Sequence, residues 1–173
     1  MKNYKILSVR TKYWEMTKPP IQPSDLEKEG CVIMKLNDPN IHYYRYLYKK
    51  VGEDVNWVNR LIMEDEELYN IINSPNTEIF VLYYKGSPAG FAEIDRKTSD
   101  QVKLVYFGII PRYREMGFGS YLLNWTIDKV WTYKPERFWF HTCELDHDAA
   151  VPTFQKAGFE IFEENLEDQL ILG

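Results

Sequence analysis

The chain has 173 residues, which fits one domain with a substantial buried core, and we expect a single domain over residues 1–173. A hydrophobic content of 45% and a charged content of 27% are ordinary for a soluble globular protein. The formal net charge of −5 argues against a general nucleic-acid partner, because nucleic-acid binding normally needs a basic face.

The sequence predicts a cytoplasmic protein without a membrane partner. No apolar run approaches the length of a membrane span, and the first residues, MKNYKILSVR, lack the apolar core of a signal peptide. Cys31 and Cys143 lie far apart, with no C-x-x-C pair and no histidine cluster at metal-ligand spacing. We therefore expect two free thiols in a reducing compartment and no metal site.

The first forty residues are expected to form an N-terminal strand and a connector. Tyr4 to Met16 alternates apolar and polar residues and contains β-branched and aromatic side chains, which predicts a strand. Lys18 to Pro23 is rich in proline and cannot form a helix or a central strand. Cys31 to Leu36 is a short apolar run, which predicts a strand or a bulge.

Residues 41–173 are expected to form the core, beginning with two or three short helices. The segment from Ile41 to Tyr48 is dense in aromatic residues. Asp54 to Met63 has apolar residues at helical spacing, and Asp65 to Ile72 shows the same pattern. Asn73 to Asn76 then ends the helical region, because asparagine, serine and proline favour turns.

Three strands should follow as an antiparallel meander. Glu78 to Tyr84, Ala89 to Asp95 and Val102 to Ile110 are apolar runs of strand length. The segments Lys85 to Pro88 and Lys97 to Asp100 between them have the composition of tight turns.

The last third of the chain predicts a long helix, a strand, a short helix and the final strands. These elements are expected at Phe118 to about Tyr133, Arg137 to Cys143, Asp148 to Lys156, and finally Phe159 to Glu163 and Gln169 to Leu172. Gly158 stands where a helix commonly ends in a left-handed residue. The order of elements predicts an α+β fold with a mixed, mostly antiparallel central sheet flanked by helices.

The stretch from Ile109 to Leu123, IIPRYREMGFGSYLL, has the features of a phosphate cradle at a strand-to-helix turn. Glycine lets backbone N–H groups approach a ligand, and the start of a helix adds unpaired donors and a positive dipole end. A dinucleotide fingerprint is excluded, because Leu122 stands where its third glycine belongs. A P-loop is excluded because no Gly-Lys-Ser/Thr triplet follows.

Two motifs carry a resemblance to a known family. R-x-x-G-x-G is formed by Arg114, Gly117 and Gly119, and A-x-x-x-F-x-x-x-G-F begins at Ala150 and ends with Gly158-Phe159. Together, in this order, they resemble the two signatures of the GNAT superfamily of N-acetyltransferases. Segments such as YRYLYKKVG and HTCELDHDAAVPTFQKAGF are similar to a bacterial subgroup whose substrate the sequence does not identify.

The resemblance implies a GNAT-like fold and acetyl-CoA as co-substrate. It implies that backbone N–H groups of the glycine turn hold the pyrophosphate, helped by two arginines, and that the end of the preceding strand aligns the pantetheine arm. It places one further contact on the short helix. The implied cofactor-binding residues are Gly108, Ile109, Ile110, Arg112, Arg114, Glu115, Met116, Gly117, Phe118, Gly119, Ser120 and Phe154.

The sequence departs from the family at two positions where relatives have groups that move protons. Lys103 stands where several relatives have a carboxylate that accepts the proton of the amine, and Glu93, Asp95 or Asp146 are the carboxylates that could replace it. Phe154 stands where relatives often have a tyrosine that protonates the leaving thiolate.

Three other side chains are candidates for proton transfer: Tyr106, His141 and His147. A histidine within an aromatic strand, such as His141, is usually a hydrogen-bonded core residue. His147 precedes a helix, where Asp146 and Asp148 have the plain role of capping the helix. Of the two histidines, His147 is the stronger candidate, and the predicted catalytic set is His147, Glu93 and Tyr106.

The expected function is N-acetyl transfer from acetyl-CoA to a primary amine of a small molecule, a peptide or a protein, by direct attack in a ternary complex. Tyr44, Tyr46 and Tyr48 are candidates for lining the acceptor site, although an aromatic core explains at least two of them equally well. The alternative is a non-catalytic acyl-CoA-binding or interaction module with the same fold. The sequence leaves monomer and homodimer both open.

Overall fold

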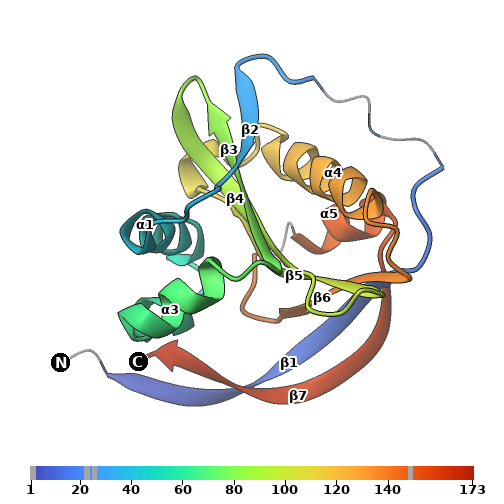
Figure 1. Ribbon diagram of the computed structural model, residues 1–173. Coiled ribbons are helices and arrows are strands. Elements are labelled where there is room, and N and C mark those ends of the chain that lie inside the picture. Colours follow the sequence, from blue (N-terminus) through green and yellow to red (C-terminus); the bar gives the residue numbers. More distant parts are fainter. Residues whose placement is uncertain (1–2, 22–23, 25–26, 148–149) are drawn as a thin grey trace.

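A computed structural model describes residues 3–21, 24, 27–147 and 150–173. Its strands form one sheet of seven in the order β2-β3-β4-β5-β6-β1-β7, with α1 and α3 on one face and α4 and α5 on the other (Figure 1). Every neighbouring pair is antiparallel except β5 and β6, which are parallel. The expected α+β fold with a mixed, mostly antiparallel sheet is therefore confirmed.

The bounds of the strands are β1 Tyr4–Met16, β2 Cys31–Lys35, β3 Thr77–Tyr84, β4 Ser87–Asp95, β5 Gln101–Ile109, β6 Arg137–Cys143 and β7 Glu160–Leu172. The helices are α1 Ile41–Gly52, α2 Asn59–Ile62, α3 Asp65–Ile72, α4 Phe118–Trp131 and α5 Ala150–Ala157, with a 3-10 turn at Pro111–Tyr113. None of the helices in these described ranges is long and apolar enough to cross a membrane.

Local sequence explains where several elements begin and turn. The Asn40 side chain accepts hydrogen bonds from the N–H groups of His42 and Tyr43, at 2.9 and 3.3 Å, and so caps α1. The hairpin between β3 and β4 turns through Lys85 and Gly86, both with positive φ, which suits the twist of a two-residue hairpin. Gly158, with φ of 102°, follows α5 as expected.

Each face of the sheet buries its own apolar cluster. On the α4–α5 face, Trp14, Leu122 and Phe138 are fully buried, and on the α1–α3 face Leu47 and Phe91 are. Because side chains alternate between faces along a strand, neighbouring residues of one strand contribute to different clusters. The sheet is thus the common wall of two cores.

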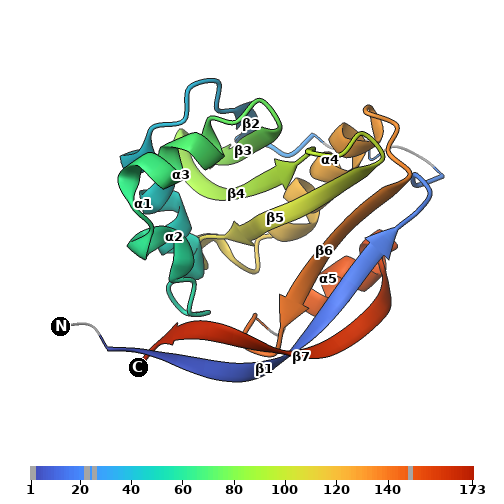
Figure 2. The ribbon, with the colours of Figure 1, turned by 60° about the horizontal axis from the view of Figure 1, so that its bottom comes forward.

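The sheet opens between β5 and β6 and is continuous on the far side of β6. β5 and β6 pair only over Gln101–Lys103 and Arg137–Trp139 and then diverge toward their C-terminal ends, as Figure 2 shows. β1 lies between β6 and β7 and pairs with both. Its Tyr13 lies opposite His141 of β6, and its Tyr4 lies opposite Leu172 of β7. The N-terminal strand therefore joins the last two strands of the chain into the sheet.

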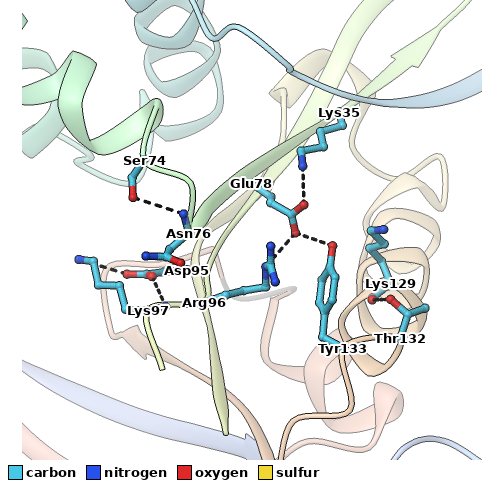
Figure 3. A network of polar contacts seen from close by, with 10 residues as sticks. All are labelled: Lys35, Ser74, Asn76, Glu78, Asp95, Arg96, Lys97, Lys129, Thr132 and Tyr133. Carbon is cyan, nitrogen blue, oxygen red and sulfur yellow. Dashed lines mark hydrogen bonds and ion pairs between the residues drawn. The ribbon is translucent and has the colours of Figure 1, made fainter. Parts of the chain in front are cut away.

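A buried carboxylate joins four segments at the other end of the sheet. Glu78 of β3 is only 4% exposed and accepts hydrogen bonds from Lys35 of β2 and, at 2.7 Å, from the hydroxyl of Tyr133 after α4 (Figure 3). Arg96, which follows β4, forms an ion pair with the same carboxylate at 3.2 Å. Its guanidinium also lies 4.1 Å from the centre of the Tyr133 ring.

Two expectations about elements were wrong. A helix over Asp54 to Met63 was expected, but only Asn59–Ile62 is helical. The N–H groups of Val55 and Trp57 both donate to the carbonyl of Gly52, and Asn56 has a positive φ of 58°, so this segment turns instead.

The end of the chain forms one strand, β7, where two short strands were expected. Its polar residues from Glu163 to Asp168 lack the apolar pattern of a strand, yet β1 pairs with them without interruption. The short helix was expected from Asp148. The structure shows it from Ala150, and residues 148–149 lie outside the described part of the chain.

Candidate functional site

A cavity of about 750 Å³ lies where β5 and β6 diverge. Its lining comes from both sides of the sheet and from both strands that form the opening. The lining residues include Leu104–Ile109 of β5, Phe140–Cys143 of β6, Glu167–Leu170 of β7, Val55–Asn59 before and in α2, Ala150 and Phe154 of α5, and the turn residues Arg114, Glu115, Gly117, Gly119 and Ser120.

The glycine turn presents a row of unpaired donors at one end of this cavity. Glu115 and Gly117 have positive φ values of 62° and 77°, and α4 begins directly afterwards at Phe118. In the described part of the chain, the backbone N–H groups from Glu115 to Ser120 have no protein acceptor. A Cβ atom built on Gly119 would meet only Ile109, at 3.9 Å, so the space above the turn is open. This arrangement fits a pyrophosphate.

The Arg114 side chain has a structural role in this turn. Its guanidinium pairs with both carboxylate oxygens of Asp54, one at 3.0 Å, and donates to the carbonyl of Val51 at 3.3 Å, while its Nε donates to that of Ile109 at 3.2 Å. The hydrogen bond from Arg114 is the main reason why the pKa of Asp54 lies below its ordinary value. Arg114 thus ties the turn to the end of α1 and to β5.

A further cation stands at the turn. The Lys28 ammonium is 3.0 Å from the position that a Cβ on Gly117 would take and 5.2 Å from the centre of the Phe118 ring. Arg112 is exposed, beside the turn but outside the cavity lining. Full positive charge next to the unpaired N–H groups therefore comes from the connector before β2 as well.

The structure brings most of the expected cofactor residues to the cavity. Gly108, Ile109, Arg114, Glu115, Gly117, Gly119, Ser120 and Phe154 line it. Ile110, Arg112, Met116 and Phe118 do not line it with their side chains. Phe118 is 2% exposed and packs on Tyr84 at a ring distance of 4.9 Å, while Met116 points outward and is 42% exposed. These four residues therefore lie beside the cavity and not in its lining.

Tyr106 is the expected catalytic residue that β5 places in the cavity wall. A bulge between Tyr106 and Leu104, opposite Glu93 and Ile94, turns Tyr106 toward α1. There its ring packs on Tyr48 and Trp57, both at 4.9 Å, and the Tyr48 hydroxyl lies 3.4 Å from the Tyr106 hydroxyl. The three rings form a rigid aromatic wall.

Glu93 lies behind this wall. It is 1% exposed, does not line the cavity, and its two oxygens accept from the Tyr44 hydroxyl and, at 3.1 Å, from Arg60. Burial raises the pKa of Glu93, and the charge of Arg60 opposes that rise. The Arg60 guanidinium also lies 5.4 Å from the centre of the Tyr106 ring. Glu93 therefore lies behind Tyr106 and Arg60, outside the lining of the cavity.

Both candidate histidines line the cavity, from different elements. His141 projects from β6, and His147 from the segment after it. Asp146 also lines the cavity, but it accepts a hydrogen bond from the N–H of Cys143 at 2.7 Å and another from Trp57, which close the loop after β6. Burial raises the pKa of Asp146.

The three tyrosines of α1 have three different environments. Tyr44 is fully buried, and its hydroxyl donates a hydrogen bond to Glu93. Tyr46 is 45% exposed and stacks on Tyr43, whereas Tyr48 lines the cavity. The helical period of 3.6 residues explains the difference, because positions 44 and 48 share a face and position 46 does not.

Three residues of the site carried no usable signal in the sequence. Asp54 and Trp57 lie in a segment that was expected to be helical, and Lys28 lies in a connector. Their roles depend on distant partners, namely Arg114 for Asp54, Tyr106 for Trp57 and Gly117 for Lys28.

Comparison with known proteins places this site in context. The model of the acetyltransferase (GNAT) family matches residues 51–159, which is more than half of the chain and includes the glycine turn. No curated protein sequence matches the chain.

Solved structures share the fold at low identity. A functionally unknown conserved protein from Staphylococcus epidermidis superposes with a TM-score of 0.70 at 16% identity, over 98% of this chain and 63% of that one. The chain thus spans less than two thirds of the length of that protein. An aminoglycoside acetyltransferase from an uncultured soil metagenomic sample superposes with a TM-score of 0.61 at 16% identity, over 75% of this chain and 88% of that one. The ribosomal-protein-S18-alanine N-acetyltransferase of Escherichia coli superposes with a TM-score of 0.59 at 18% identity, over 74% of this chain and 76% of that one.

Proposed function

Because this chain belongs to the acetyltransferase (GNAT) family, which implies acetyl-CoA as co-substrate, we propose that it is an N-acetyltransferase. The acceptor is a primary amine of a small molecule, a peptide or a protein, which attacks directly in a ternary complex. The observation that carries this proposal is the row of unpaired N–H groups at residues 115–120, at one end of a cavity between diverging strands.

The binding residues follow from the geometry of the turn and of β5. Backbone N–H groups from Glu115 to Ser120 hold the pyrophosphate, and Lys28 and Arg112 add positive charge beside them. The backbone of Gly108 to Ile110, at the end of β5, aligns the pantetheine arm. Phe154 lines the cavity from α5 and gives the arm an apolar contact.

The chemistry requires two proton movements. Acetyl-CoA supplies a thioester whose carbonyl carbon accepts the amine and whose thiolate leaves. An alkyl amine has a pKa of about 10.4 and must lose a proton before it attacks. The cavity offers two imidazoles for that step, His141 and His147, while Tyr106 is the proton donor available to the thiolate. Arg60, which is paired with Glu93, lies over the Tyr106 ring from behind.

Calorimetric titration with acetyl-CoA, followed by an assay of free thiol release with a panel of amines, tests the function. Aminoglycosides and peptides with N-terminal alanine are the first members of the panel, because two proteins of similar fold are named for such acceptors. Binding with amine-dependent thiol release is expected. A folded protein that binds no acetyl-CoA would contradict the proposal.

Gly117→Glu tests the cradle separately. The carboxylate would face the pyrophosphate, and like charges in contact cost several kcal/mol, so acetyl-CoA affinity should fall by more than about 100-fold. Gly86→Glu is the matched control, because Gly86 has a similar φ of 83° and nothing lies within 4 Å of its would-be Cβ. Equal affinity in both variants would remove the assignment of the turn.

A non-catalytic acyl-CoA-binding module is the second candidate. Phe154, which cannot donate a proton, and Lys103, which replaces a carboxylate common in relatives, favour it. Acetyl-CoA binding without thiol release across the whole panel would support this alternative.

A further inference from the structure

His141 is held on β6 with its imidazole facing the cavity. Its neighbours Phe140 and Thr142 are buried on the opposite face, where Phe140 packs on Phe154 at a ring distance of 4.4 Å. Because successive side chains of a strand alternate, His141 must point to the other face, and the side chain is exposed there. Pairing with Tyr13 of β1 fixes the backbone at this point.

The imidazole of His141 differs from that of an ordinary core histidine. Over the residues that the structure describes, it makes no hydrogen bond and no ion pair, whereas a core histidine normally has a partner. Its aromatic neighbour is Tyr13, with 5.7 Å between the two ring centres. The Tyr13 hydroxyl donates a hydrogen bond to Glu167 of β7. A ring nitrogen is thus available to a molecule in the cavity.

The charged groups around His141 come from two other strands. Lys103 of β5 lies on one side, with its ammonium 4.9 Å from the centre of the Trp139 ring, and Glu167 of β7 lies on the other. Burial lowers the pKa of His141, Lys103 lowers it further, and Glu167 opposes both. The lowered pKa favours the neutral imidazole, and Glu167 is placed to stabilise the imidazolium once a proton arrives.

The wall of the cavity opposite His141 supplies a proton donor. Tyr106 projects from β5 into the same cavity and is held by Tyr48 and Trp57. A proton acceptor on β6 and a proton donor on β5 stand on the two strands that diverge around the cavity. Such a division separates the group that serves the amine from the group that serves the leaving thiolate.

We propose that His141 is the catalytic base that deprotonates the acceptor amine, an inference that rests on the acetyltransferase function proposed above. The ammonium form of the amine gives one proton to the imidazole, and the freed nitrogen forms the bond to the acetyl carbon. The carbon–sulfur bond breaks with its electron pair on sulfur, Tyr106 protonates the sulfur, and the N–H proton lost on amide formation restores Tyr106. The imidazolium returns its proton to water.

The other candidates are less well placed for this step. Glu93 has both oxygens occupied behind the aromatic wall, and Lys103 does not line the cavity. His147 lines the cavity but lies on the segment after β6, outside the strand pairing that fixes His141. His141 alone among these groups lines the cavity from a strand residue whose backbone is fixed by pairing, opposite Tyr13 of β1.

Titration of the three histidines by NMR tests the premise without any turnover. The signals are assigned from the variants His42→Gln, His141→Gln and His147→Gln. His141 is expected to titrate below the ordinary value of about 6.5. A His141 midpoint well above neutral pH would overturn the proposal, because the ring would then already carry a proton when the amine binds.

The pH dependence of kcat/KM tests the role itself. Wild-type kcat/KM should fall as the pH drops through the His141 midpoint, because the imidazolium cannot accept a proton. His141→Gln should lose this acidic limb and about 10²–10⁴-fold in kcat/KM, with acetyl-CoA affinity retained in calorimetry. His42→Gln, which alters an exposed residue of α1 outside the cavity, is the matched control and should keep wild-type kinetics.

The possible failures are distinguishable. Absence of thiol release by the wild type with every amine counts against the acetyltransferase function, and it appears before any histidine is changed. Full kcat/KM in His141→Gln overturns the role of His141 alone. Loss of the acidic limb in His147→Gln instead of His141→Gln would also overturn it and assign the step to His147.

Discussion

Glu78 is a buried carboxylate with three cationic or hydroxyl partners and no connection to the cavity. Burial acts to raise its pKa, but the hydrogen bonds from Lys35 and Tyr133 and the charges of Lys35 and Arg96 together outweigh burial, so the pKa lies below its ordinary value. A carboxylate whose pKa is lower in the folded state stabilises that state above the unfolded pKa of about 4.5. This stabilisation is lost as the pH falls through the folded pKa.

We predict that Glu78→Gln lowers the free energy of unfolding at pH 7 by about 1–3 kcal/mol, the cost of leaving Lys35 and Arg96 without their charged partner. The difference from the wild type should shrink as the pH falls below about 4.5, because the wild-type carboxyl then becomes neutral too. Urea unfolding at several pH values measures both effects. Glu29→Gln, at an exposed carboxylate, is the control, and an equal loss at pH 3 and pH 7 would contradict the explanation.

The contact between α1 and β5 depends on the absence of a side chain. A Cβ atom on Gly108 would lie 2.3 Å from Cγ1 of Val51, and a Cβ on Gly90 would lie 2.5 Å from the carbonyl oxygen of Gly108. Helix and strands therefore approach each other more closely than any larger residue at these positions permits. The approach sets the position of the β5 backbone that faces the cavity.

Gly108→Ala should destabilise the protein by about 1–3 kcal/mol, because the added methyl forces α1 away from β5. Val51→Ala removes the methyl that it would strike. In the double variant the two losses should therefore be less than additive, by at least about 0.5 kcal/mol in a urea-unfolding cycle. Additive losses would show that the clash lies elsewhere.

Elements whose bounds are set by local residues could be predicted from the sequence, and elements that depend on distant partners could not. β3, β4 and β5 were predicted to within two residues at each end, because short apolar runs are separated by local turn residues. The segment before α2 failed because apolar spacing did not reveal the left-handed Asn56 or the shared acceptor at Gly52. The middle of β7 failed because its strand state depends on β1 and not on its own composition.

Within the site, the sequence predicted the glycine turn, because its donors are backbone groups ordered by local residues. It did not predict which side chains face each other across the cavity. Glu167 and Trp57 come from segments far from the turn, and the sequence does not reveal the face to which β6 directs His141. The Arg114–Asp54 pair was likewise invisible without the fold.

For the whole molecule, the position of β1 decides whether the sheet is complete. β1 pairs with β6 and β7 and buries Trp14 against Phe140 and Phe154, at ring distances of 6.0 and 6.1 Å. Without it, β7 has no neighbour among the described strands, and the wall of the cavity formed by β6 and β7 loses its connection.

Deletion of residues 1–16 should therefore abolish amide protection from exchange in β6 and β7 and lower the midpoint of thermal unfolding. The loss of the Trp14 side chain alone is worth about 3–5 kcal/mol. A synthetic peptide of residues 1–16, added back, should restore protection in both strands. A truncated chain that unfolds at the wild-type midpoint would show that β1 is dispensable.

The same strand has a consequence for how the molecule is made. A ribosome produces β1 first, but the partners of β1 appear only after β2 to β5 and α4 have been synthesised. At 5–20 residues per second, the nascent chain carries the apolar Trp14 and Met16 unpaired for on the order of ten seconds. The wall that holds His141 and Glu167 is thus the last part of the cavity to close, and a nascent chain interrupted before β6 has the glycine turn without the strand that carries the proposed base.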